Sequence, residues 1–210
     1  MSCLLYTSSQ APYQYLLIGF LPDRLQLSLT VFPSNTPLSV EHSAGTLEQA
    51  YQYGGCGEVG RQLAEEMRIS IGKYMDFTDL TLSNAVDLAG GFSYEFSDNL
   101  MMPNGIRISS GTQFVGGELF VNLLHYCQQI QEWSLALELY SQLFGNILSF
   151  PDYLSIQEYY QELVNSMDTD ISLHDLAEHE QAITLMLNRD YVHAAAYRGD
   201  NMAELAEEYR

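Results

Sequence analysis

Residues 13–32 have the sequence YQYLLIGFLPDRLQLSLTVF and contain the clearest indication of the fold. Residues 13–20 form an apolar run. Pro22 and Asp23 then indicate a tight turn, because proline fixes φ and aspartate tolerates turn geometry. Residues 25–32 alternate between apolar and polar side chains, which is the period of a strand with one buried face. The stretch therefore predicts a β-hairpin whose second strand is half-buried.

The flanking sequence predicts more strands and several helices. Capping-box spacing, in which Ser or Thr precedes an acidic or amide residue by three positions, predicts helix starts at Thr46, Ser155 and Ser172. Gly54-Gly55 is expected to interrupt the first of these helices. Other helices are expected where apolar residues recur at helical spacing, and strands or strand-and-loop segments at residues 3–6, 69–77, 92–114 (with a turn at 103–105) and 191–197.

This order of elements indicates the fold class. Hairpin strands followed by alternating helices and strands predict an α/β fold, with a mixed central β-sheet flanked by helices. The chain has 210 residues, of which 47% are hydrophobic and 12% aromatic, so it can bury a full core and wholesale disorder is excluded. The sequence contains no internal repeat and no long linker, and we therefore expect a single domain over residues 1–210.

The charge of the chain excludes one class of partner. Lys and Arg number 8 against 27 Asp and Glu, and the formal net charge is −19. Such a field repels polyanions, so no nucleic-acid partner is expected, and attraction to an anionic membrane surface is disfavoured for the same reason.

Cysteine usage and the amino-terminal sequence leave the compartment open. Cys3, Cys56 and Cys127 are an odd number without metal-ligand spacing, and we expect incidental thiols, with one disulfide plus one free thiol as the alternative. No apolar run reaches the length of a membrane span, and the first residues do not resemble a signal peptide. Either the protein is cytoplasmic, or an anchor that places it outside the cytoplasm has been trimmed away.

Few residues point to chemistry on their own. His174 and Glu178 are four residues apart on an expected helix, a spacing that suits a metal, but a solvated helix face explains them better because no third ligand is evident. Asp168, Asp170 and Asp175 lack the glycine and terminal glutamate of a calcium loop and indicate a turn followed by a helix cap.

Several stretches, in order, resemble the LytR-CpsA-Psr family of bacterial cell-envelope proteins. The hairpin ends in Pro33-Ser34-Asn35-Thr36, where that family has Pro-Arg-Asp-Thr. The other similar stretches are Leu47-Glu48-Gln49-Ala50-Tyr51-Gln52-Tyr53-Gly54-Gly55, Val86-Asp87-Leu88-Ala89-Gly90-Gly91, Pro103-Asn104-Gly105 and Thr169-Asp170-Ile171-Ser172. The stretches from Ile69 to Phe77 and from Gly111 to Glu118 are also similar to the family, and the resemblance covers nearly the whole chain, from about Leu4 to Gly199.

The resemblance implies a fold and an activity. Family members transfer a glycopolymer from a polyprenyl pyrophosphate carrier to peptidoglycan, outside the membrane that anchors them. A hydrophobic tunnel between sheet and helices holds the prenyl chain, several Arg residues grip the pyrophosphate, and Asp residues hold Mg²⁺. A pyrophosphate leaving group develops negative charge, which fixed cations must offset.

This chain departs from the family at those positions. The family's acidic and basic motifs after the first strand fall where only residues 7–12 stand, in a shortened loop without charge. Ser34 and Asn35 replace an Arg and an Asp, and the two arginines of the family's Tyr-Val-Arg-x-Arg fall at His125 and Cys127. The candidate remnants of a ligand site are Ser34, Asn35, His125, Cys127 and Gln129, and no catalytic residue, metal ligand or cofactor is assigned.

The missing charges predict a pseudoenzyme: a non-catalytic binding or scaffolding module of the cell envelope. Its expected partners are a polyprenyl lipid, an envelope glycopolymer or an active paralogue of the family. Two alternatives stay open. One is an active glycopolymer–peptidoglycan transferase with a rebuilt site, for which His125 and Cys127 would be the thiol–imidazole candidates, although i and i+2 on a helix point to different sides. The other is a cytoplasmic interaction domain on the same fold.

Overall fold

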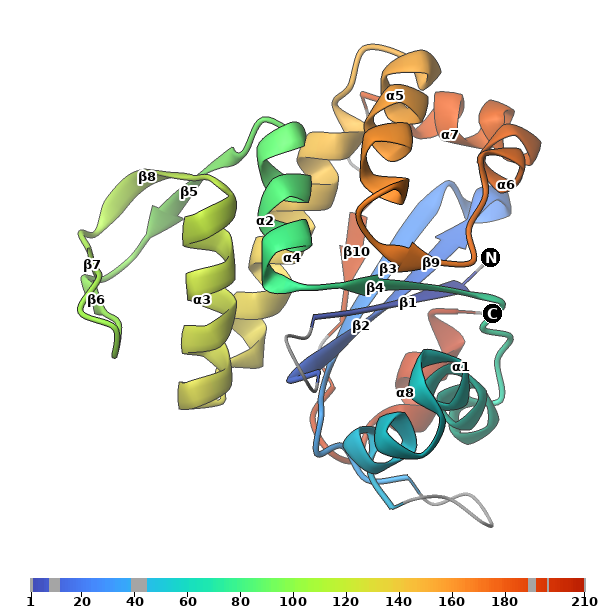
Figure 1. Cartoon of the computed structure of the whole chain (residues 1–210), viewed down its shortest axis with the longest axis horizontal. Helices are drawn as coiled ribbons and strands as arrows, with labels where there is room; N and C mark the ends of the chain where they lie inside the picture. The colour runs from blue at the N-terminus through green and yellow to red at the C-terminus, as the bar shows by residue number, and fades with distance from the viewer. Residues whose placement is uncertain (1, 8–11, 39–44, 189–191, 196, 210) are drawn as a thin grey trace.

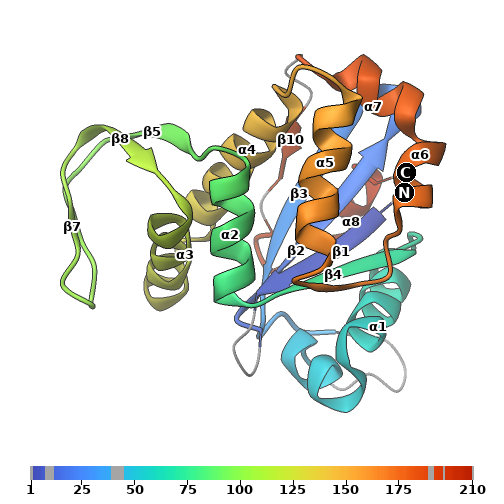
Figure 2. The same cartoon turned by 45° about the horizontal axis from the view of Figure 1, so that its top comes forward.

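The computed structural model describes residues 2–7 (backbone only), 12–38, 45–188, 192–195 and 197–209. A six-stranded mixed sheet in the order β10-β3-β2-β1-β4-β9 forms the centre, and two short two-stranded ribbons, β5-β8 and β6-β7, project from one end (Figures 1 and 2). The strands are β1 (Ser2–Thr7), β2 (Gln14–Leu21), β3 (Gln26–Pro33), β4 (Lys73–Phe77), β5 (Phe92–Phe96), β6 (Leu100–Met101), β7 (Arg107–Ile108), β8 (Gly111–Val115), β9 (Asp168–Thr169) and β10 (Val192–Ala194).

Helices cover both faces of this sheet (Figure 1). On one face α1 and α8 enclose a smaller core, and on the other α2 to α7 pack over a larger one. The helices are α1 (Leu47–Met67), α2 (Asp79–Leu88), α3 (Gly117–Ile130), α4 (Trp133–Leu148), α5 (Tyr153–Val164), α6 (Leu173–Glu178), α7 (Glu180–Met186) and α8 (Met202–Glu207). The predicted α/β class with a mixed central sheet flanked by helices is confirmed.

The predicted β-hairpin is present, but the expected half-burial of its second strand is wrong. β2 and β3 pair antiparallel around a 3₁₀ turn at Pro22–Arg24. Ser28 and Thr30 were expected to face solvent, yet they are 1% and 0% exposed. The C-terminal segment covers that face, and the Tyr209 hydroxyl donates to Thr30 Oγ1 (2.7 Å) while the Ser28 hydroxyl donates to the carbonyl of Glu208.

Helix starts agree with the capping signals in two of three cases. Thr46 and Ser172 accept hydrogen bonds from the backbone three residues on, as predicted. The predicted start at Ser155 is wrong, because Asp152 supplies the cap by accepting from the backbone N–H of Ser155. The predicted interruption of the first helix is confirmed: α1 bends where Gly55 adopts a φ of 64°.

Candidate functional site

An almost purely apolar cavity of about 240 Å³ lies between the sheet and the helices of its larger core. The sheet contributes side chains from β2, β3 and β4 to its wall, and α2, α4, α5, α6 and α7 supply most of the rest, including Asp175 of α6. Representative lining residues are Ile18, Met75, Leu82, Phe144, Ile147, Tyr159, Leu163 and Ile183. A cavity with an almost wholly apolar surface selects an apolar guest, and a tunnel in this place is what the family resemblance implies.

One end of the cavity borders a buried polar cluster. Tyr140 on α4 lines the cavity, and its hydroxyl accepts a 2.7 Å hydrogen bond from Nε2 of Gln14, at the start of β2. Both side chains are almost inaccessible to solvent, at 1% exposure each. Burial raises the pKa of Tyr140 well above its usual value, and the nearby charge of Asp79 adds to this shift.

Asp79 and His125 form the solvent-facing part of the same cluster. Asp79 is the first residue of α2, immediately after its Thr78 cap, and its Oδ2 lies 2.9 Å from Nε2 of His125 on α3. The His125 ring in turn packs against the Tyr13 ring, with centroids 4.7 Å apart and the ring planes tilted by 36°. The pair thus connects α2 and α3 next to Tyr13, which immediately precedes β2.

Three of the predicted ligand residues are near this cluster: His125 belongs to it, and Ser34 and Asn35 lie in the turn beside it. The backbone N–H of Ser34 donates to the carbonyl of Tyr13, so the turn after β3 lies beside the residue that His125 contacts. Asn35 is exposed in that turn. The assignment of Ser34, Asn35 and His125 to a ligand site remains a prediction, because their neighbourhood alone does not identify a ligand.

Cys127 and Gln129, the other two predicted ligand residues, are not part of this cluster. Cys127 is fully buried in the larger core, and burial raises its pKa to about 12. Gln129 is exposed near the end of α3. Because a thiol this hard to ionise is a poor nucleophile, and His125 bonds to Asp79 instead, the geometry argues against a Cys127–His125 pair.

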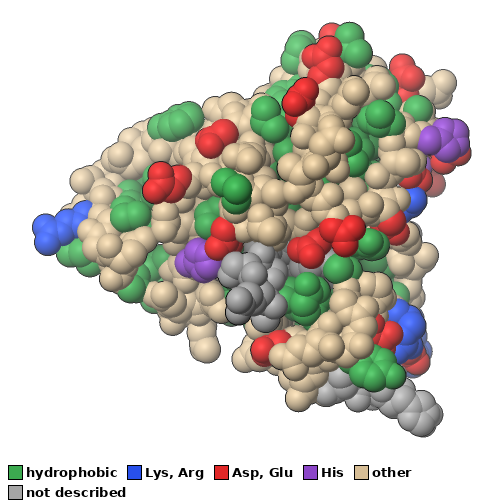
Figure 3. All heavy atoms as spheres, viewed as in Figure 1, with side chains coloured by type: hydrophobic (Ala, Val, Ile, Leu, Met, Phe, Trp, Pro, Cys, Tyr) green, Lys and Arg blue, Asp and Glu red, His purple; other side chains and the backbone are tan. Residues whose placement is uncertain are grey.

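The basic residues that the structure describes lie away from the Asp79–His125 pair. Arg24 lies in the turn beyond the far end of β2. Gln14 is at the start of this strand, and the seven residue steps to Leu21 cover roughly 23 Å. Arg107 lies on the projecting ribbon, and Arg68 lies at the end of α1 on the other face of the sheet. The other three are held in ion pairs: Arg61 with Glu58 and Glu65, Lys73 with Asp175, and Arg198 with Glu204. On the face in Figure 3, basic side chains lie at the left tip and the right side, and the centre carries acidic and histidine side chains.

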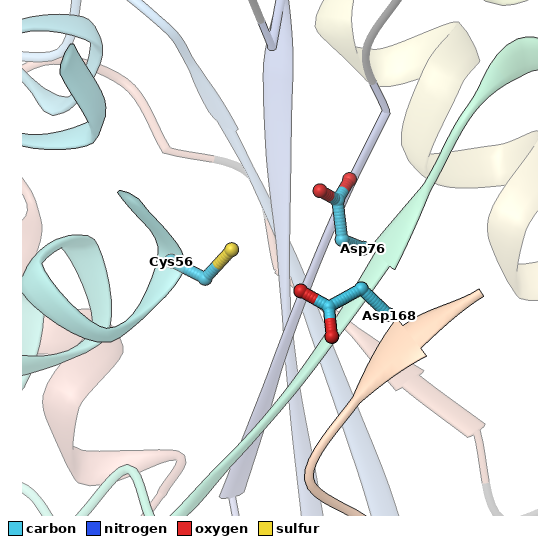
Figure 4. A group of neighbouring side chains, drawn as sticks. All are labelled: Cys56, Asp76 and Asp168. Atoms are coloured by element: carbon cyan, nitrogen blue, oxygen red, sulfur yellow. The ribbon is translucent and has the colours of Figure 1, made fainter. Parts of the chain in front are cut away.

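A second cluster lies on the other face of the sheet. Cys56 on α1, Asp76 on β4 and Asp168 on β9 place one ligand atom each within 4.8 Å of the others (Figure 4). Asp76 and Asp168 are directly paired across the two strands, and Cys56 follows the Gly54-Gly55 bend that turns it toward them. Sequence analysis missed this cluster, because the three residues come from elements that are distant along the chain.

The electrostatics of this cluster follow from two close carboxyl groups. Burial, with the charge of Asp168, raises the pKa of Asp76 to about 6, and burial with Asp76 raises that of Cys56 to about 12. One thiol and two carboxylates are a donor set that could take a divalent cation such as Zn²⁺. By contrast, His174 and Glu178, the pair with metal spacing, lie exposed on α6 as a solvated pair 3.4 Å apart.

Comparisons with known proteins address the fold. No protein-family model matches the sequence, and a search of curated proteins finds no match. Solved structures do match. A proposed transcription regulator from Eubacterium siraeum DSM 15702 is 19% identical with a TM-score of 0.85, over 99% of this chain and 90% of that one.

Two further structures carry known names. TagV of B. subtilis is 12% identical with a TM-score of 0.76, over 100% of this chain and 96% of that one. TagT bound to LIIa-WTA is 14% identical with a TM-score of 0.75, over 100% of this chain and 89% of that one. In the part of the chain that the structure describes, no helix combines the length and apolarity needed to cross a bilayer. TagT and TagV are phosphotransferases of the LytR-CpsA-Psr family, and this chain therefore has the fold of that family.

Proposed function

We propose that this protein is a non-catalytic lipid-binding module of the cell envelope, which holds a long apolar chain such as the polyprenyl part of a carrier lipid. The observation that carries the proposal is the apolar cavity, because its end at Gln14, Tyr140 and the Asp79–His125 pair holds no described Lys or Arg side chain. An apolar cavity gains free energy by burying a hydrocarbon chain, whatever head group follows it.

The neighbours support the kind of ligand. TagT has been solved with LIIa-WTA, a wall teichoic acid ligand, bound to a domain of the same fold. In this chain, the equivalent use is to hold such a lipid outside the cytoplasm and present it to an active paralogue. The single domain over residues 1–210 would then act as a carrier.

The electrostatics support the absence of transfer chemistry. Breaking a pyrophosphate linkage needs fixed positive charge or a metal ion where negative charge develops. At the polar end of the cavity, the described groups are Gln14, Tyr140 and the Asp79–His125 pair. These groups supply a carboxylate where a transferase of this kind needs guanidinium groups.

A binding experiment tests the lipid-holding role. Displacement of Nile red by farnesol should report a saturable site, and Ile147→Trp, which fills the cavity from α4, should weaken binding by about tenfold. Leu154→Trp is the matched control, because that side chain is 58% exposed on α5 and does not line the cavity. Equal binding by both variants would place the lipid elsewhere and contradict the proposal.

An activity experiment tests the non-catalytic part. The protein is incubated with a polyprenyl-pyrophosphate-linked sugar, Mg²⁺ and peptidoglycan oligomers, and transfer is followed by mass spectrometry. We expect no transfer above a heat-denatured control. Transfer that depends on His125 would support the rebuilt-site alternative instead.

A further inference from the structure

We propose that the polar end of the cavity selects an amphiphile whose head group donates hydrogen bonds and carries no negative charge, and that it rejects a diphosphate. This inference rests on the proposed lipid-holding function and adds the chemistry of the head group. It is based on the hydrogen-bonding capacity that remains unused in the cluster of Gln14, Asp79 and Tyr140.

Gln14 provides the first unused acceptor. Its side chain is 1% exposed, and its Nε2 donates to the Tyr140 hydroxyl. Its Oε1 is buried and has no hydrogen-bond partner among the residues that the structure describes. Buried carbonyl oxygens are rarely left without a donor, because the loss of water is then not compensated. A ligand that donates to this oxygen would compensate it.

Asp79 provides the second unused acceptor. Its Oδ2 bonds to His125, whereas its Oδ1 is buried and, within the described part of the chain, has no partner. An ionised carboxylate accepts hydrogen bonds and cannot donate them. The two unused groups are therefore both acceptors, and one of them belongs to an anion.

Gln14 and Asp79 do not line the apolar cavity themselves, but each lies beside a residue that does. Tyr140 is a member of both sites, since its ring lines the cavity and its hydroxyl bonds to Gln14. Leu82, which also lines the cavity, lies one helical turn after Asp79 on the same side of α2. A guest with its chain in the cavity can thus extend its head group toward Gln14 and Asp79.

The negative charge of Asp79 and the two unused acceptor oxygens decide which head group fits. A hydroxyl or ammonium group donates hydrogen bonds to the unused oxygens. A diphosphate offers almost only acceptor oxygens and negative charge, so it would leave both oxygens unpaired and be repelled by Asp79. The preference runs against pyrophosphate, although the fold is that of proteins that bind it.

The test compares three probes with one chain: farnesol, farnesylamine and farnesyl diphosphate, each measured by displacement of Nile red with and without Mg²⁺. We expect the alcohol and the amine to bind at least about tenfold more tightly than the diphosphate, with no rescue by Mg²⁺. Diphosphate binding that equals or exceeds that of the alcohol overturns the inference but leaves the lipid-holding function standing. If none of the three probes binds, the proposed function fails as well.

Two variants assign the selectivity to its residues. Asp79→Asn removes the charge without changing size and should reduce the alcohol-to-diphosphate ratio by about tenfold. Asp23→Asn is the control, because it removes the same charge at the exposed turn of the hairpin, at the opposite end of β2 from Gln14. Gln14→Met, which keeps the volume and removes the amide, provides a second route if Asp79→Asn does not fold. An unchanged ratio in a folded variant at Asp79 overturns the inference.

Discussion

The ring of Tyr209 lies against the backbone of Gly19, in the place that a Cβ atom would occupy. A methyl group built on Gly19 would stand 2.6 Å from Cδ1 of Tyr209. The Tyr209 hydroxyl is hydrogen-bonded to the carbonyl of Leu17 (3.1 Å) and to Oγ1 of Thr30 (2.7 Å), so this residue of the smaller core is held on the central hairpin. The strand has glycine there because any larger residue would displace the ring.

Gly19→Ala should therefore destabilise the protein. The added methyl group pushes the Tyr209 ring away and strains its two hydrogen bonds, and we expect a loss of about 1–3 kcal/mol in the free energy of unfolding. Urea unfolding followed by circular dichroism measures this change. Gly57→Ala is the control with the opposite sign, since nothing lies within 4 Å of its added methyl group and alanine favours the helix by about 0.5–1 kcal/mol. A stabilising Gly19→Ala would contradict the close contact.

Tyr140→Phe tests the buried hydrogen bond at the end of the cavity. Removal of the hydroxyl leaves Nε2 of Gln14 buried without its acceptor, and we expect a loss of about 1–3 kcal/mol. Tyr53→Phe should change stability by less than about 0.5 kcal/mol, because that side chain is 82% exposed. Thermal unfolding of both variants provides the comparison, and equal melting temperatures would show that the bond does not contribute.

The sequence predicts local structure better than it predicts which faces are covered. The turn at Pro22-Asp23, the bend at Gly54-Gly55 and the cap at Ser172 follow from backbone preferences of single residues, and all three are present. Burial of Ser28 and Thr30 depends on the chain near Tyr209, about 180 residues later, and no local pattern contains that information.

The long-range contacts of the two side-chain clusters, Asp79–His125 and Cys56–Asp76–Asp168, were likewise harder to predict than local structure. The position of His125 near the turn at Ser34 could be expected because family resemblance aligns both with one site, but its partner Asp79 was not identified. Asp168 was interpreted as part of a turn, and only the pairing of β4 with β9 places it opposite Asp76. Long-range strand pairing decides that contact, and a single sequence does not encode it in a readable pattern.

Asp76→Asn should stabilise the protein at neutral pH. The pKa of Asp76 is raised from 3.8 to about 6 in the folded state, so the folded protein binds a proton that the unfolded chain has released. Stability contributed by this group is therefore lost as pH rises from about 4 to about 6, and it stays lost above that range. With the shift discounted for partial exposure, we expect a gain of about 1 kcal/mol at pH 7.5 and almost none at pH 3.5.

The measurement for Asp76→Asn is a series of urea unfolding curves between pH 3.5 and 8. Asp98→Asn removes a carboxylate from an exposed turn and should show no such difference between the two ends of the range. A variant that is less stable than the parent at pH 7.5 would indicate that the ionised carboxylate is stabilised in the native protein, against the geometry of the cluster.

Cys56 should react slowly with iodoacetamide even though it is only half-buried. Burial and Asp76 raise its pKa to about 12, which leaves a thiolate fraction of about 10⁻⁴ at pH 8. Because alkylation proceeds through the thiolate, the reaction is slow. Asp76→Asn removes the neighbouring charge and should accelerate alkylation of Cys56 severalfold, as followed by peptide mass spectrometry. Cys127 is an internal control, since it is buried in the other core and should be unaffected. The charge that raises the pKa of this thiol would also attract a cation to it. If Cys56 in the folded protein reacts as fast as in the unfolded chain, the carboxylates do not act on this sulfur.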